Sequence, residues 1–177
     1  PDLTTAIVPV GAPHPLALRS LRARALSGPA LQYVSLRIPG LAERRLRSRS
    51  ALEGLLRSWA GPHTREALAE EAPYYAELLS RPGAARSALE PLRNLVLSRA
   101  ETAALDKPVT VPVLSMQGEL DPVQPAQAYA RDTHHVAGNL RQVTIHRSGH
   151  FPQEETPAGF VRALLPFLAD VAPPTSA

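Results

Sequence analysis

The sequence predicts an α/β protein in which parallel strands are combined with a long all-helical segment. Residues 13–108 carry apolar side chains at helical spacing, punctuated by proline and glycine. Residues 109–171 instead alternate short strand-like runs with helical runs. A strand, helix, strand, helix order is typical of parallel sheets. The charge changes at the same boundary, because residues 13–108 hold 15 basic and 9 acidic residues whereas residues 109–177 hold 4 and 6.

The composition excludes several classes of protein. With 44% apolar and 20% charged residues, the chain is neither disordered nor membrane-like. It has no apolar window long enough to span a bilayer and no secretory signal, so we expect a cytoplasmic protein. The first residue is not methionine, and we expect the chain to begin inside a longer product.

Binding partners are also restricted. The basic residues are nearly all arginine and are interleaved with glutamate, so no nucleic-acid partner is expected. The chain has no cysteine, and no set of three histidines has metal-ligand spacing, so we predict no metal site.

The helical segment contains one pattern that is strong by itself. Ser50 and Glu53 fit a capping box, and the helix they open ends before Gly61-Pro62. Its predicted apolar face consists of Leu52, Leu55, Leu56 and Trp59. Further helices are predicted at 15–26, 64–72, 73–80 and 84–99.

The last third of the chain predicts two parallel strands, at 110–118 and 140–146, with a helix over 125–138 between them. Thr156 is the predicted cap of a final helix. The apolar stripe of that helix is predicted to comprise Phe160, Val161, Leu164, Leu165 and Leu168. Residues 4–11 predict one more strand.

These elements divide the chain into four parts. Residues 1–12 form a core strand, 13–108 a helical segment, 109–171 a parallel-sheet half and 172–177 a tail. Three or four sheet elements cannot complete a doubly wound fold, so the predicted sheet lacks strands.

Two polar side chains occupy positions where parallel sheets place reactive groups. Asp121 in "GELDPVQP" follows one strand, and His150 in "HRSGH" follows the next. Their loops should be adjacent, and an aspartate that accepts the Nδ1 proton of a histidine prepares the ring to act as a general base. Gly149 is expected to permit a tight turn, and Glu155 to cap the last helix or to hold the histidine loop.

The runs "GELDPVQP" and "VTIHRSGHFPQEETP", together with "LQYVSLRIPGLAERRL" and "YYAELLSRPGAARSALEPLRNL" upstream, resemble the C-terminal part of α/β-hydrolase-fold enzymes of the epoxide hydrolase type. The resemblance covers about residues 6–170. It implies a partial α/β-hydrolase fold with a helical cap, Asp121 as the acid, His150 as the base and no cofactor. It also implies a nucleophile elbow, Gly-x-Ser-x-Gly or Gly-x-Asp-x-Gly, which these 177 residues do not contain. We therefore expect an upstream half of the same fold to carry the nucleophile.

The resemblance further implies a small hydrophobic substrate, an epoxide or an ester. In epoxide hydrolases of this group two cap tyrosines protonate the epoxide oxygen. Tyr33 falls close to the first, whereas Pro91 and Leu92 occupy the second position. This substitution makes an ester, lactone or other acyl substrate the main alternative. Tyr74 and Phe151 are also assigned to substrate binding.

Two other functions are left open. A dehalogenase would share the fold. A catalytically incomplete interaction module would use its unpaired sheet edge to bind another chain, and a homo-oligomer is compatible with either.

Overall fold

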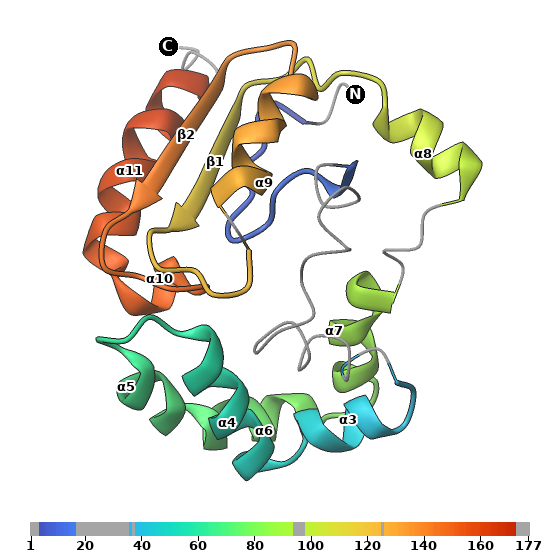
Figure 1. The fold of residues 1–177 in the computed structure, drawn as a ribbon, viewed down its shortest axis with the longest axis vertical. Coiled ribbons are helices and arrows are strands. Elements are labelled where there is room, and N and C mark those ends of the chain that lie inside the picture. Colours follow the sequence, from blue (N-terminus) through green and yellow to red (C-terminus); the bar gives the residue numbers. More distant parts are fainter. Residues whose placement is uncertain (1–3, 17–35, 37, 94–97, 125, 173–177) are drawn as a thin grey trace, which may run out of the picture.

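The computed structural model of the chain describes residues 4–16, 36, 38–93, 98–124 and 126–172. Figure 1 shows a small parallel sheet flanked by helices, with a group of helices at the carboxyl ends of its strands. No helix among these residues is both long and apolar enough to cross a membrane.

The predicted strands are confirmed as a parallel pair. β1 (Val113–Gly118) runs beside β2 (Leu140–Ile145) with Val113 opposite Leu140 and Gly118 opposite Ile145. β1 begins three residues later than predicted, directly after Pro112, which has no amide proton to donate to a ladder.

The predicted strand at 4–11 lies parallel along the other edge of β1, as two isolated bridges rather than a continuous strand. Ile7 pairs with Val113 and Val10 with Met116. The amide of Met116 donates to the carbonyl of Pro9 at 2.9 Å. β1 is therefore hydrogen-bonded to a neighbour on each edge. Its side chains are also buried on both faces of the sheet.

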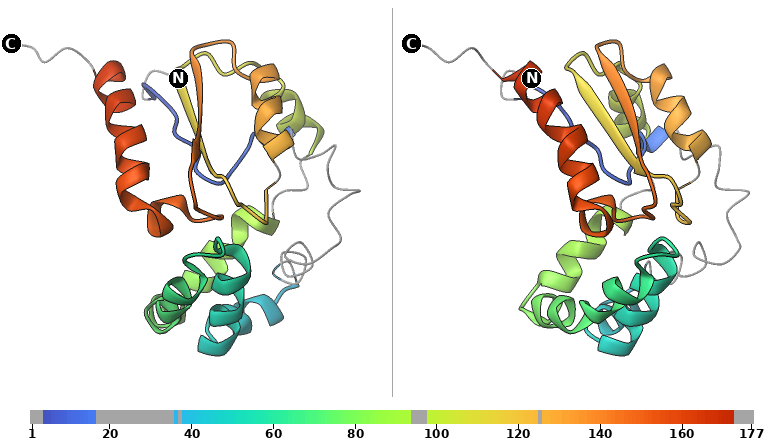
Figure 2. Two further views of the ribbon diagram at one scale, coloured as in Figure 1. Left: turned by 60° about the vertical axis from the view of Figure 1, so that its left-hand side comes forward. Right: turned by 90° about the vertical axis from the view of Figure 1, so that its left-hand side faces the viewer.

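Helices cover the two faces of the sheet, as the views in Figure 2 show. α9 (Ala126–Ala130) and the 3-10 turn η1 (Arg131–His134) lie on one face, and α11 (Pro157–Val171) lies on the other. Phe167 of α11 is 1% exposed and packs with Leu114, Met116 and Ile145. The predicted helix at 125–138 is confirmed only in part, because the α-helix ends at Ala130 and the 3-10 turn that follows ends at His134.

The last helix differs from its prediction at two points. A short helix, α10 (Pro152–Glu155), precedes α11, and Thr156 makes no side-chain capping bond. The predicted stripe on α11 is only partly buried. Phe160 and Leu164 pack against the sheet, whereas three of its members remain exposed: Val161, Leu165 and Leu168.

Five helices form a second hydrophobic cluster, called the helical cluster here: α3 (Leu41–Leu46), α4 (Arg49–Trp59), α5 (Arg65–Glu70), α6 (Ala72–Ser80) and α7 (Ala84–Arg93). Its buried residues include Ala42, Leu46, Leu52, Leu56, Trp59, Leu68, Ala72, Ala85 and Leu89. The predicted apolar face of α4 is confirmed. Its predicted cap is wrong, because Ser48 accepts the bond from the Ala51 amide while Ser50 lies inside the helix.

The predicted helix at 84–99 is also corrected. The described part of α7 ends at Arg93, and a separate helix, α8 (Arg99–Leu105), follows. Ser98 and Glu101 form a capping box that starts α8 afresh.

Candidate functional site

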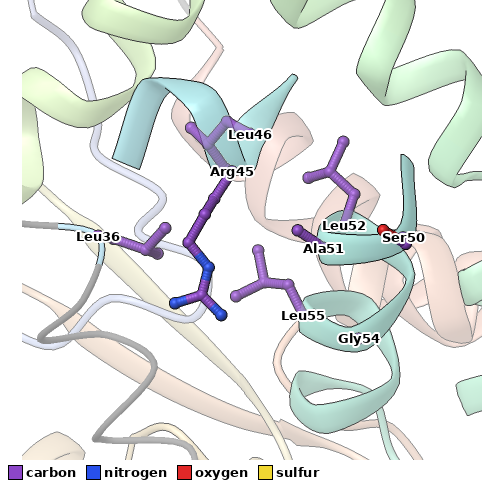
Figure 3. Close-up of a pocket in the computed structure, with 8 residues that line it drawn as sticks. All are labelled: Leu36, Arg45, Leu46, Ser50, Ala51, Leu52, Gly54 and Leu55. Carbon is purple, nitrogen blue, oxygen red and sulfur yellow. The ribbon is translucent and has the colours of Figure 1, made fainter. Parts of the chain in front are cut away.

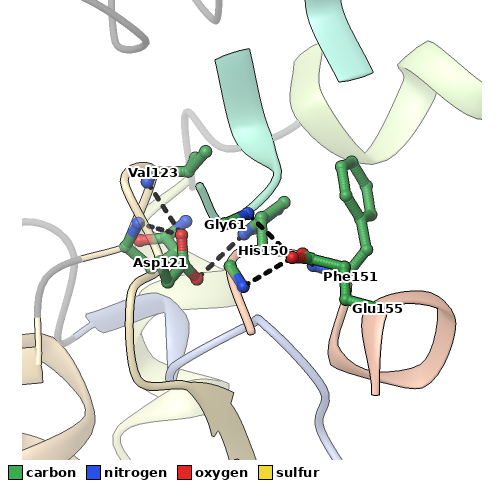
Figure 4. Close-up of polar contacts among 8 residues, drawn as sticks. Gly61, Asp121, Val123, His150, Phe151 and Glu155 are labelled. Atoms are coloured by element: carbon green, nitrogen blue, oxygen red, sulfur yellow. Dashed lines mark hydrogen bonds and ion pairs between the residues drawn. The ribbon is translucent and has the colours of Figure 1, made fainter. Parts of the chain in front are cut away.

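Asp121 lies in the turn that follows β1, and its two oxygens have different partners. Oδ1 accepts hydrogen bonds from the amides of Val123 and Gln124 at 2.8 and 3.0 Å. Oδ2 lies 3.0 Å from Nδ1 of His150. Only 2% of the Asp121 side chain is exposed, compared with 16% for His150. The turn thus fixes the carboxylate and leaves one oxygen for the imidazole (Figure 4).

The His150 ring is held on several sides. It meets the Trp59 ring edge-on, with centroids 5.1 Å apart, and the Phe151 ring at 5.2 Å. Gly11 packs against it with a positive φ of 60°, and a Cβ there would lie 3.0 Å from the His150 carbonyl and 3.4 Å from Cε1. With Nδ1 donating to the aspartate, Nε2 is the nitrogen left to accept a proton.

The backbone of the histidine loop (residues 146–151) lies very close to the backbones of two neighbouring segments. A Cβ on Gly149 would lie 2.2 Å from the amide nitrogen of Gly61, and one on Gly118 only 1.8 Å from the carbonyl of Gly149. The φ of Gly149 is not positive. The glycine is therefore needed not for a left-handed backbone but because the end of α4 passes so close, and its expected role in a tight turn stays a prediction.

Glu155 accepts four hydrogen bonds from two separate segments. Its Oε2 accepts from the amides of Gly61 and Gly149 at 2.7 and 2.9 Å, and from the hydroxyl of Thr64 at 2.5 Å. Its Oε1 accepts from the amide of Phe151 at 3.0 Å. Glu155 thus holds the histidine loop, one of its two predicted roles, and also ties that loop to the helical cluster.

A pocket of about 150 Å³, lined by both apolar and polar side chains, lies within the helical cluster (Figure 3). Its lining residues are Leu36, Arg45, Leu46, Ser50, Ala51, Leu52, Gly54 and Leu55. Leu55 is one helical turn from Trp59, about 6 Å along the axis of α4. The same helix therefore lines the cavity and contacts the His150 ring.

The remaining predicted site residues are not all gathered around the pair. Phe151 contacts the His150 ring, as described above. Tyr33 and the side chain of Leu92 lie outside the described residues. Tyr74 is 57% exposed on α6, where its ring contacts Tyr75 at 5.6 Å, and its assignment to substrate binding stays a prediction.

Tyr75, the neighbour of Tyr74, forms a hydrogen bond to the sheet half (residues 109–171). Its hydroxyl donates to Glu154 Oε1 at 3.0 Å, and burial together with this bond raises the pKa of Tyr75 to about 12. No sequence signal distinguished Tyr75 from its neighbour.

Sequence reasoning missed a buried acid on η1, which lies on the face of the sheet opposite α11. Asp132, 3% exposed, accepts from the amide of His14 at 2.8 Å and from the hydroxyl of Ser115 at 3.1 Å. The His14 ring stacks on His135, with centroids 4.2 Å apart. Burial and the neighbouring His135 lower the pKa of His14.

A cavity of about 190 Å³ lies beside this cluster, between α9 and the sheet. Tyr129 is among its lining residues, and its buried hydroxyl has no hydrogen-bond partner in the described part of the chain; burial, followed by the charges of Asp121 and Asp132, raises the pKa of Tyr129.

Neither a protein-family model nor a curated protein matches the sequence. Solved structures do match its fold. A candidate acyltransferase from Salmonella enterica is similar with a TM-score of 0.77 at 18% identity, over 97% of this chain and 58% of that one. Epoxide hydrolase A from Mycobacterium thermoresistibile gives a TM-score of 0.65 at 23% identity, over 97% of this chain and 64% of the enzyme.

A meta-cleavage product hydrolase from Pseudomonas fluorescens gives a TM-score of 0.57 at 20% identity, over 93% of this chain and 56% of the enzyme. The chain therefore spans between 56% and 64% of the length of these three proteins. At such identities the likeness concerns the fold. The chain has a mixed α/β fold with two parallel strands that matches about half of an α/β-hydrolase-fold chain.

Proposed function

We propose that this chain supplies the acid and the general base of an α/β-hydrolase that works through a covalent ester intermediate. The observation that carries the proposal is the 3.0 Å contact between Asp121 Oδ2 and His150 Nδ1 in loops that follow adjacent parallel strands. Nε2 of His150 takes a proton from water as the water oxygen attacks the carbonyl of the covalent ester; the ester C–O bond then breaks, and the imidazolium returns the proton to the departing oxygen. Asp121 holds the ring and stabilises the imidazolium that forms.

The substrate is a small hydrophobic epoxide or ester. The pocket of about 150 Å³ in the helical cluster supports a substrate of this size, and its lining offers apolar side chains together with the polar Arg45 and Ser50. We propose that the helical cluster acts as the lid of the site and that Phe151 lines it. An ester, lactone or other acyl substrate is the specific alternative. It is favoured because Pro91, which lies inside α7 and has no proton to donate, stands where the resemblance calls for a second tyrosine.

The partner that completes the site is a further part of the same fold, which carries the nucleophile. Two features of the described residues support this. The segment 4–11 forms one edge of the sheet, with Ile7 39% exposed. Three apolar residues of α11 are exposed as well: Val161 (44%), Leu165 (57%) and Leu168 (41%). Apolar surface of this kind marks a face that another element covers.

The test replaces His150 by Gln in the full-length product of the gene and measures turnover of an aryl epoxide and of a p-nitrophenyl ester. We expect turnover to fall by at least about 100-fold. The matched control is His146→Gln. His146 lies only four residues upstream but is 78% exposed and paired with Glu119, so its replacement should leave turnover within about twofold of wild type.

The same variant separates the two chemistries. An aspartate nucleophile is already ionised, so His150→Gln should still react once and accumulate a covalent adduct that mass spectrometry detects. A serine nucleophile needs the histidine to remove its proton, so neither adduct nor product should form. Turnover by His150→Gln equal to that of wild type would overturn the proposal.

A further inference from the structure

The backbone of the histidine loop is held at three successive amides. The amide of Gly149 donates to Glu155 Oε2, that of His150 to the carbonyl of Trp59 at 2.9 Å, and that of Phe151 to Glu155 Oε1. The peptide groups on both sides of His150 are therefore fixed. One carboxylate provides two of the three acceptors, and α4 of the helical cluster provides the third.

The other two donors to Glu155 come from the segment that follows α4. The Gly61 amide and the Thr64 hydroxyl both donate to Oε2, the same oxygen that receives the Gly149 amide. Each carboxylate oxygen offers about two lone-pair sites, so Oε2 with its three donors is crowded whereas Oε1 accepts one bond. Since three donors from the helical cluster and the histidine loop share one oxygen, displacement of either segment disturbs the contacts of the other.

We propose that Glu155 is a positioning residue that keeps His150 aligned with Asp121 while residues 59–64 of the helical cluster are seated against the histidine loop. The inference rests on the proposed function. It names Glu155 as the residue through which the position of the general base, His150, depends on the helical cluster, the proposed lid. If the helical cluster moved away, Glu155 would lose two donors and the His150 amide would lose the carbonyl of Trp59. The ring would also lose its contact with Trp59, and the histidine loop would keep only the Gly149 and Phe151 bonds to Glu155 and the bond of His150 to Asp121.

Glu154 provides a matched control for Glu155. It is the preceding residue on α10 and also contacts the helical cluster, through the hydroxyl of Tyr75. Its carboxylate bond is to Tyr75 rather than to an amide of the histidine loop. Glu154→Gln and Glu155→Gln make the same chemical change one residue apart, and only the second removes an acceptor from the amides that flank His150.

Thr64→Val provides a second variant that cuts the link on one side. It removes the hydroxyl bond to Glu155 with little change of side-chain volume and retains the bonds to Gly149 and Phe151. If the alignment of His150 depends on the helical cluster, Thr64→Val should reproduce part of the effect of Glu155→Gln.

The experiment uses the full-length product of the gene and two measurements. The first is the NMR resonance of the Nδ1 proton of His150, assigned by its loss in His150→Gln, which reports the bond to Asp121 whether or not a substrate is known. The second is kcat and KM with whichever ester or epoxide the wild type hydrolyses. Circular dichroism confirms that each variant is folded at the assay temperature.

We expect Glu155→Gln to broaden or shift the Nδ1 resonance and to lower kcat by about 10- to 100-fold with KM changed less than about threefold, because misplacing a catalytic group by about 1 Å costs up to about 100-fold. Thr64→Val should lower kcat by about 3- to 10-fold, and Glu154→Gln should match wild type in both measurements.

An unchanged Nδ1 resonance in a folded Glu155→Gln variant would overturn the positioning role, as would equal effects of Glu154→Gln and Glu155→Gln. If Glu155→Gln fails to fold, Thr64→Val decides by the same two measurements. A shifted resonance in a protein that hydrolyses no substrate would support the positioning role while the proposed hydrolase function fails.

Discussion

The contact between Gly149 and the end of α4 makes a sharp prediction about stability. In Gly149→Ala the new methyl group would lie 2.2 Å from the Gly61 nitrogen, 2.6 Å from the Ala60 carbonyl carbon and 2.8 Å from the Trp59 oxygen. All three are backbone atoms of residues 59–61, so no side chain can rotate to make room. Reaching ordinary contact requires the two segments to separate by more than about 1 Å.

The energetic cost follows from the bonds that cross this contact. Separation draws the Gly61 amide away from Glu155 and the His150 amide away from the Trp59 carbonyl. These two hydrogen bonds are 2.7 and 2.9 Å long. A buried donor without an acceptor costs about 1–3 kcal/mol, so two cost about 2–6 kcal/mol. Allowing for partial relaxation, we expect Gly149→Ala to lower the free energy of unfolding by about 3 kcal/mol.

Urea unfolding measures this cost at the site itself, because Trp59 is the one tryptophan of the chain and lies in the contact. At a typical urea dependence of about 2 kcal/mol/M, the midpoint should fall by about 1.5 M. The control is Gly54→Ala on α4, where no atom lies within 4 Å of the added Cβ and a gain of about 1 kcal/mol is expected. A Gly149→Ala midpoint within about 0.3 M of wild type, with unchanged Trp59 emission, would refute the reasoning.

The raised pKa of Tyr75 favours the neutral phenol in the folded state, so its contribution to stability is present below pH 10 and is lost as the pH rises from 10 to about 12. Absorbance of tyrosinate should show Tyr75 titrating at lower pH in Glu154→Gln, and an unchanged titration would contradict the assigned bond. Asp132→Ala should leave the His14 amide and the Ser115 hydroxyl without an acceptor, at about 1–3 kcal/mol each in urea unfolding. A loss below about 0.5 kcal/mol would contradict the burial of that carboxylate.

Sequence periodicity was most informative where one local rule dominates. The apolar face of α4 was predicted from spacing alone, because burial of one helical face requires that spacing. β1 was predicted from a short apolar run that ends in glycine, because a strand buried on both faces admits few polar residues. Predictions were weaker at helix ends. Ser48 rather than Ser50 caps α4, because two nearby hydroxyls fit the same pattern; Thr156 does occupy the N-cap position of α11, but its hydroxyl makes no capping bond.

Three of the five predicted stripe residues on α11 are exposed, and this difference from the prediction has another reason. Val161, Leu165 and Leu168 have the spacing of buried residues, yet the described part of the chain leaves them exposed. Periodicity reports which residues favour burial but does not identify the surface that covers them.

The sequence by itself determined that Asp121 and His150 follow consecutive parallel strands, since strand order and topology bring such loops to one edge of a sheet. Tertiary structure alone decided what surrounds them. The contacts of His150 with Trp59 and Gly11, and the hydrogen bonds of Glu155 with Gly61 and Thr64, join residues that are 91 or more positions apart. Distances of that kind are set by how the helical cluster packs on the sheet, and local sequence patterns carry no information about that packing.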